Sequence, residues 1–322
     1  MKKIFISIGI ILSLIIAFLV IDNILFDGIR PKKINKNGFQ ANYFLKPNIK
    51  NKTAVVSLGG GQWADYWSQQ FAQKGYVGLS LPYRGNNDLP KLTEEIPLEY
   101  FENAIKWLKA QPEVNPKKII VMGASRNSEL ALILGAAFPE LISGVIAYSP
   151  SAVSWSNTVL PYNSDTIKAS WTYKGIDISY VPMDKIIGGT TSEINTLKYW
   201  KTGLSKHNYV KDALIKAEKI NGPILLLSGK NDAVWPSSIM ANMIDKRLHD
   251  NHFKYPHQNI QYENAGHLIS GNPDSNSDAS ERKGKMTINN KVYEFDFGGT
   301  INGDNTAKKL AKTEVLKFVS NL

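Results

Sequence analysis

One serine lies where the sequence predicts a sharp turn between a buried strand and a helix. Ser125 follows the apolar run 119–122 and precedes the run 128–134, which is rich in helix-forming residues. A strand, tight turn and helix in this order expose the serine hydroxyl and are typical of a nucleophile elbow. The backbone N–H of Arg126, at the start of the helix, would then point to the place where an oxyanion forms. A helix-capping serine is the structural alternative for Ser125.

The Gly-x-Ser pattern is common, and its context separates Ser125 from two other serines. Ser80 lies in a strand-like run that is followed by Pro82, and Ser205 has no strand before it. Ser125 itself departs from the elbow pattern in one respect. The position two residues later, usually a glycine that allows strand and helix to approach closely, is Asn127 here. For that reason a fold kept as a non-catalytic binding scaffold stays an alternative.

An acidic residue and a histidine follow Ser125 in the chain order that this type of Ser–Asp–His triad requires. The strand-like run 223–228 ends in a polar turn that contains Asp232. A second run, 260–262, leads into a loop that ends at His267. Because ligands of open α/β sheets bind beyond the carboxyl ends of the strands, we expect Ser125, Asp232 and His267 to share that edge. Taken singly, Asp232 would be a turn-stabilising residue and His267 a structural histidine.

A glycine-rich loop is the candidate for the second half of an oxyanion hole. A strand-like run leads directly into residues 59–62, Gly-Gly-Gly-Gln. Glycines let a backbone approach a substrate closely and turn its N–H groups inward. We expect the N–H of Gly61 or Gln62, in the loop that includes Gly60, to act beside that of Arg126. A phosphate-binding loop is excluded because no Lys-Ser/Thr pair follows, and the glycine spacing also fails the dinucleotide pattern.

Strand-like and helical runs alternate through the chain, which predicts an α/β-hydrolase fold with a mostly parallel central sheet and helices on both faces. One expected helix presents an apolar face made of Leu98, Phe101, Ile105 and Leu108. Strands are expected at 118–122, 144–147 and 223–227. Between 149 and 221 the alternation stops. We expect an insertion at about 150–220 to form a lid, whose aromatic side chains either line an acyl pocket or pack the lid on the body.

Several stretches together resemble a known family. They are Leu58-Gly59-Gly60-Gly61, Gly123-Ala124-Ser125, Asp232-Ala233-Val234-Trp235-Pro236 and Ala265-Gly266-His267-Leu268-Ile269. Over residues 38–322 the chain resembles the C-terminal catalytic domain of acyl-CoA thioesterases and bile acid-CoA:amino acid N-acyltransferases. The resemblance implies Ser125 as nucleophile, Asp232 as acid and His267 as base.

Two departures from that family concern domain content and the nucleophile. Family members commonly carry a β-sandwich domain before the catalytic one, and residues 1–37 are too few for such a domain. Some members use a cysteine nucleophile, whereas this chain has Ser125 and no cysteine at all. A serine makes hydrolysis the expected outcome rather than transfer to an amine.

Composition limits the other function classes. The chain has 322 residues and a net charge of +10 that is spread over the chain. No basic run is interleaved with aromatic residues as in a nucleic-acid-binding surface, so we expect no nucleic-acid partner. The absence of cysteine excludes disulfides and thiolate metal sites. We expect neither a cofactor nor a metal, and a small-molecule acyl ester or thioester as the substrate.

The amino terminus predicts a membrane anchor. After Lys2 and Lys3, an uncharged run of 18 residues, apolar except for Ser7 and Ser13, extends from 4 to 21, close to the about 20 residues of a bilayer-spanning helix. A cleavable signal peptide is the alternative, but its apolar region is usually about 7–15 residues long and ends in an Ala-x-Ala-like site. The expected organisation is a transmembrane anchor or signal segment at 1–27, a linker at 28–37 and the catalytic domain at 38–322.

The side of the membrane on which the domain lies would decide its substrate. The expected function is hydrolysis of acyl thioesters such as acyl-CoA through an acyl-enzyme intermediate, which suits a domain in the cytoplasm. The basic residues near the start favour a domain on the outer side. There a carboxylesterase or an acyltransferase acting on envelope-side acyl substrates is the alternative.

Overall fold

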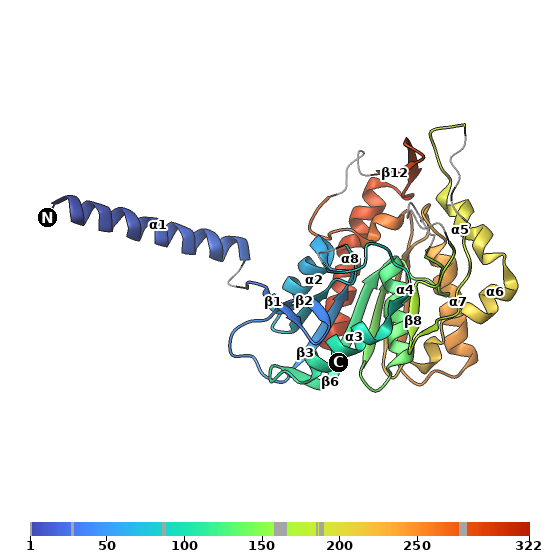
Figure 1. The fold of residues 1–322 in the computed structure, drawn as a ribbon, viewed down its shortest axis with the longest axis horizontal. Coiled ribbons are helices and arrows are strands. Elements are labelled where there is room, and N and C mark those ends of the chain that lie inside the picture. The colour runs from blue at the N-terminus through green and yellow to red at the C-terminus, as the bar shows by residue number, and fades with distance from the viewer. Residues whose placement is uncertain are drawn as a thin grey trace.

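A twisted eight-stranded sheet forms the centre of the computed structural model, which describes residues 2–26, 29–85, 88–157, 166–184, 186, 190–276 and 282–322 (Figure 1). The strand order is β1-β2-β4-β3-β6-β7-β10-β11. These strands are β1 (Lys32–Lys36), β2 (Phe39–Phe44), β3 (Lys52–Leu58), β4 (Val77–Leu81), β6 (Val114–Ala124), β7 (Gly144–Tyr148), β10 (Ile224–Gly229) and β11 (His257–Tyr262). From β4 to β11 all neighbours are parallel, whereas β1 and β2 form an antiparallel edge.

The helices cover both faces of this sheet, because successive strand residues point to opposite sides. Ala54 and Val56 of β3 belong to one buried cluster, and Val55 between them belongs to another. The first cluster receives α3 (Leu98–Lys109), α4 (Arg126–Ala137) and α7 (Ser237–Asp250), and the second receives α2 (Gly61–Gln73) and α8 (Ile301–Ser320). All four apolar residues predicted for the face of α3 are fully buried. The predicted α/β architecture is thus the observed one.

Smaller elements lie outside the eight-stranded sheet. The short strands β5 (Ile96–Pro97), β8 (Trp171–Tyr173) and β9 (Ile176–Asp177) pair with one another, and β12 (Lys283–Ile288) and β13 (Lys291–Asp296) form a hairpin. The remaining helices are α5 (Thr196–Leu204), α6 (His207–Ala213) and the short 3₁₀ helices η1 (Ala217–Lys219) and η2 (His267–Ser270). The hairpin turns at Asn289-Asn290, where both residues have a positive φ.

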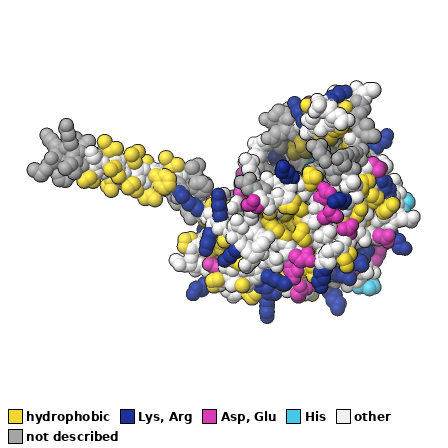
Figure 2. Space-filling model, in the orientation of Figure 1, with side chains coloured by type: hydrophobic (Ala, Val, Ile, Leu, Met, Phe, Trp, Pro, Cys, Tyr) yellow, Lys and Arg dark blue, Asp and Glu magenta, His cyan; other side chains and the backbone are white. Residues whose placement is uncertain are grey.

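The structure corrects the expectation for the amino terminus. α1 (Lys2–Phe26) is helical and projects from the body with hydrophobic side chains on its visible surface (Figures 1 and 2). A bilayer-spanning helix needs about 20 consecutive apolar residues. Across the described residues, none of the helices combines the length and the apolar character of a membrane span. The expected transmembrane anchor, and the membrane contact and localisation that depended on it, are therefore wrong.

Candidate active site

Ser125 occupies a strained turn between β6 and α4. Its backbone angles are φ 56° and ψ −123°, a region that residues other than glycine rarely adopt. The turn is held because the Ser125 N–H donates to the carbonyl of Tyr148 at 2.9 Å. Gly123 allows the close approach of α4, since a Cβ atom there would lie 2.0 Å from the carbonyl oxygen of Asn127. The Ser125 hydroxyl makes no capping bond to α4 in the described structure, so the helix-capping alternative is not the observed arrangement.

Asp232 is a buried acceptor of four hydrogen bonds just after β10. Its Oδ1 accepts the backbone N–H groups of Val234 at 2.9 Å and Trp235 at 3.2 Å. Its Oδ2 accepts the hydroxyl of Ser237 at 2.7 Å and lies 2.9 Å from Nδ1 of His267. A carboxylate only accepts, so Nδ1 of His267 is the donor in this hydrogen bond.

His267 follows β11 and begins η2. Its backbone N–H donates to the carbonyl of Phe297 at 2.8 Å. Its ring makes an edge contact with Trp235, with ring centroids 6.1 Å apart, and stacks with Phe297 at 6.5 Å. These contacts restrict the imidazole, and only 9% of the residue is exposed. The histidine is therefore held in one orientation by its neighbours and by Asp232.

The three residues predicted to act together lie at one edge of the sheet. Ser125 follows β6, Asp232 follows β10 and His267 follows β11, and β6, β7, β10 and β11 run parallel in that order. The structure joins Asp232 and His267 by a hydrogen bond, and it places Ser125 at the carboxyl end of a strand in the same parallel set. Their catalytic roles stay predictions.

Two helix N-termini supply backbone N–H groups at this edge. Gly59, Gly60 and Gly61 have φ values of 100°, 64° and 67°, which only glycine adopts without strain. α2 begins at Gly61, so the N–H groups of Gly61 and Gln62 belong to its first turn, as that of Arg126 belongs to the first turn of α4. First-turn N–H groups have no partner within their helix and favour a negative charge. β3 and β6, the strands before the two turns, are neighbours in the sheet.

A buried ion pair behind the elbow was not anticipated from the sequence. The guanidinium of Arg126 pairs with the carboxylate of Glu129, which is fully buried. Glu129 also accepts the backbone N–H of Trp155 at 3.1 Å and the indole N–H of Trp171 at 2.9 Å. Burial raises the pKa of Glu129, while the charge of Arg126 opposes that shift. The three-residue spacing of a basic and an acidic residue was the available signal, but such a pair is usually solvent-exposed.

A second buried carboxylate supports the loop that carries His267. Asp304, in the first turn of α8, accepts the N–H of Gly266 at 2.7 Å. Burial raises the pKa of Asp304, and Arg282, whose Nη1 lies 3.7 Å from Asp304 Oδ2, opposes the shift. No local sequence pattern connects Asp304 to the histidine loop, because the contact joins segments 38 residues apart.

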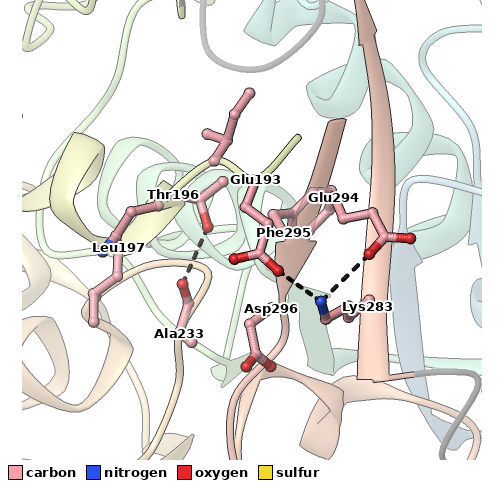
Figure 3. Close-up of a pocket in the computed structure, with 10 residues that line it drawn as sticks. Glu193, Thr196, Leu197, Ala233, Lys283, Glu294, Phe295 and Asp296 are labelled. Atoms are coloured by element: carbon pink, nitrogen blue, oxygen red, sulfur yellow. Dashed lines mark hydrogen bonds and ion pairs between the residues drawn. The ribbon is translucent and has the colours of Figure 1, made fainter. Parts of the chain in front are cut away.

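A cavity of about 420 Å³ is lined by Ala233, the start of α5 and the β12–β13 hairpin (Figure 3). Thr196 on its wall donates to the carbonyl of Ala233, the residue after Asp232, at 3.1 Å. Figure 3 shows Lys283 between Glu193, at 2.8 Å, and Glu294, at 3.3 Å. Carboxylates outnumber cations in the lining. Among the described residues, no group of three or more His, Cys, Asp or Glu side chains could hold a metal ion.

Solved structures with the same architecture include two hydrolases. A Klebsiella pneumoniae protein assigned as a dienelactone hydrolase matches with a TM-score of 0.53 and 13% sequence identity, over 91% of this chain and 98% of that chain. A dienelactone hydrolase-like promiscuous phosphotriesterase from metagenomic libraries matches with a TM-score of 0.53 and 14% identity over the same shares. At such low identity these matches concern the fold alone, and they confirm the predicted α/β-hydrolase architecture.

Similarity to proteins of known sequence assigns the chain to a family. Acyl-coenzyme A thioesterase 1 of Rattus norvegicus is 31% identical over 254 residues, 75% of this chain and 54% of the rat protein. Mitochondrial acyl-coenzyme A thioesterase 2 of Mus musculus is 30% identical over 244 residues, 75% of this chain and 50% of the mouse protein. The chain thus spans about half the length of these relatives. The family model described as BAAT / Acyl-CoA thioester hydrolase C terminal matches residues 96–321. The resemblance inferred from the sequence is therefore confirmed, and the chain belongs to the BAAT / acyl-CoA thioester hydrolase C-terminal family.

Proposed function

We propose that this protein is a serine hydrolase that cleaves acyl thioesters through Ser125, Asp232 and His267. The observation that carries the proposal is the hydrogen bond from His267 to the buried Asp232, at the sheet edge that also holds the strained Ser125 turn. A nucleophile, a base and an orienting carboxylate in this chain order are the parts of an acyl-transfer site.

In the proposed reaction His267 Nε2 takes the proton of the Ser125 hydroxyl as Oγ attacks the thioester carbonyl. Asp232 keeps the Nδ1–H tautomer and stabilises the imidazolium that forms. The N–H of Arg126 and the N–H groups of Gly60, Gly61 and Gln62 are proposed to bind the oxyanion of the tetrahedral intermediate.

Collapse of this intermediate breaks the carbon–sulfur bond and releases the thiol, which takes its proton from His267. The acyl group is then an ester on Ser125. A water molecule, deprotonated by His267, attacks that ester and releases the carboxylic acid, and Ser125 regains its proton. As proposed, the two half-reactions use Ser125, His267, Asp232, the backbone N–H groups and water.

Acyl-CoA is the proposed thioester because the relatives named acyl-coenzyme A thioesterases are about 30% identical over 75% of this chain. The cavity beside Ala233 carries more carboxylates than cations, so we place the phosphates of CoA outside it. The catalytic domain is proposed to span 38–322, with the segment at about 150–220 acting as a lid; 158–165, 185 and 187–189 of that segment lie outside the described residues. Trp155 and Trp171 connect that segment to the elbow helix through Glu129.

The test is thioester turnover, measured by a thiol-reactive dye, with acyl-CoA esters of increasing chain length and matched oxygen esters. Ser125→Ala should lower turnover on the order of 10⁴-fold or more. Ser205→Ala is the matched control, since Ser205 shares the Gly-x-Ser pattern but is exposed after α5, and it should keep wild-type activity. Retained turnover in Ser125→Ala would reject the proposal. An amine that captures the acyl group faster than water would indicate an acyltransferase instead.

A further inference from the structure

The side chain of Asn127 lies between the elbow helix and the glycine loop after β3. A Cβ atom on Gly59 would lie 2.3 Å from Nδ2 of Asn127 and 2.9 Å from its Cγ. The amide of Asn127 therefore fills the space that a side chain at position 59 would need. The two residues are complementary: a larger residue stands where the elbow pattern usually has glycine, and a glycine stands opposite it.

The amide of Asn127 is oriented by a fixed hydroxyl. Tyr83 Oη donates to Asn127 Oδ1 at 2.8 Å. Tyr83 is only 2% exposed, and its ring makes edge contacts with Phe101, at 5.5 Å between centroids, and Trp171, at 5.4 Å. Because the ring is held on two sides, its hydroxyl directs Oδ1 of Asn127 towards Tyr83 and leaves Nδ2 against Gly59.

The segment that carries Tyr83 also holds the glycine loop. The N–H of Gly59 donates to the carbonyl of Leu81 at 2.9 Å. A Cβ atom on Gly60 would lie 2.5 Å from Cβ of Pro82. The glycine loop therefore rests on the end of β4 on one side and on Asn127 on the other, and Tyr83 connects those two supports.

We propose that Asn127 is a positioning residue that fixes the distance between the two sets of oxyanion donors, the N–H of Arg126 on α4 and those of Gly60–Gln62 at the start of α2. The inference rests on the proposed function. A glycine at position 127 would leave a gap beside Gly59, and the loop could then move relative to α4. On this account the asparagine is an alternative way to build the oxyanion hole and does not mark a lost activity.

The test compares Asn127→Gly, Tyr83→Phe and the double variant in the full chain. Two readouts report on the oxyanion hole: kcat for thioester hydrolysis, and the rate at which a fluorophosphonate labels Ser125, because the phosphonyl oxygen occupies the place of the oxyanion. Thermal unfolding of each variant is measured beside them. Tyr83→Phe leaves Asn127 in place and removes one hydroxyl, so it keeps the test usable if the glycine variant folds poorly.

Asn127→Gly should lower kcat and the labelling rate by about 10- to 100-fold, the cost of a misplacement of about 1 Å, with KM changed less than about twofold. Tyr83→Phe should lower kcat in the same direction, and the double variant should lose less than the product of the single losses, because both act through one contact. Three results would overturn the inference about Asn127 but leave the proposed function standing. They are unchanged kcat and labelling in Asn127→Gly, an effect of that variant on KM only, and losses in the double variant that equal the product of the single losses. A folded wild-type protein that takes no label would overturn the proposed function, and the inference with it.

Discussion

Replacing Asp232 by asparagine should lower turnover by about 10⁴-fold while leaving the fold intact, because the amide has only one favourable orientation. Oδ1 of Asp232 accepts two backbone N–H groups, from Val234 and Trp235. An asparagine oxygen can take that place, whereas an NH₂ group there would face two donors. The new NH₂ group must therefore replace Oδ2 and face Ser237 and His267.

The Asp232→Asn substitution would change the tautomer of His267. An NH₂ group opposite Nδ1 donates, so Nδ1 must accept and the proton moves to Nε2, which can then no longer take the proton of Ser125. A wrong tautomer of this kind costs about 10⁴-fold in kcat. At about 1.36 kcal/mol per tenfold change, that is about 5.4 kcal/mol of transition-state stabilisation. The free energy of unfolding should fall by only about 1–2 kcal/mol, because every polar atom keeps a partner.

The assay is steady-state hydrolysis of an acyl thioester by the Asp232→Asn variant, with urea unfolding as the check on folding. The matched control is Ser237→Ala, which removes one donor to the carboxylate but leaves its charge and its bond to His267. This control should lose no more than about tenfold, since a single hydrogen bond contributes about 0.5–1.5 kcal/mol. If folded Asp232→Asn retains kcat within tenfold of wild type, the assignment of Asp232 as the orienting acid is refuted.

Three further predictions concern stability. Glu129→Gln breaks the buried pair with Arg126 and should lower the free energy of unfolding in urea by about 3 kcal/mol; an unchanged value would mean that the pair is not stabilising. Burial would raise the pKa of Glu218, but its hydrogen bonds and ion pair with Arg247 outweigh this and lower the pKa below its ordinary 4.5. The stabilisation is therefore full above about pH 4.5 and is lost as the pH falls through the lowered pKa. Glu218→Gln should remove that part of the pH dependence of unfolding, measured in urea between pH 6 and 3, and an unchanged pH dependence would contradict the contribution of this ion pair. Gly123→Ala should destabilise the protein by about 3 kcal/mol or prevent folding, because its Cβ would overlap the backbone of α4; wild-type thermal stability would contradict the close approach.

Sequence periodicity is sufficient to predict the elements that carry the site. The strand expected at 118–122 is the end of β6, and the strand expected at 260–262 is the end of β11. These runs are apolar or end in clear turn residues, so local preference and burial agree. The parallel arrangement of the strands then follows from the fold class, which explains why periodicity and fold class together assign Ser125, Asp232 and His267 to one edge.

Contacts between distant segments could not be predicted in this way. Asn127 is a departure from the elbow pattern, and nothing in the sequence shows that it faces Gly59 and accepts a bond from Tyr83. Glu129 could equally have been a solvated charge on the surface of α4. The contacts of Asn127 and the burial of Glu129 both depend on side chains from distant segments that the fold brings together. The periodicity of the sequence does not predict such pairs.

At the amino terminus, the sequence predicts the secondary structure but not the surroundings of the helix. Its apolar run predicts a helix, and α1 is a helix, but apolar character alone does not determine what surrounds that helix. Secondary structure follows from the local run of residues, whereas the membrane assignment requires a further condition on length and hydropathy that the described helices do not meet.

Fluorophosphonate labelling of the folded full chain, followed by peptide mapping of the labelled site, would show whether Ser125 is an activated nucleophile. We expect one label per chain on Ser125, absent from Ser125→Ala and unchanged in Ser205→Ala. A folded wild-type protein that takes no label, or that carries it on another serine, would contradict the assignment of Ser125 as an activated nucleophile.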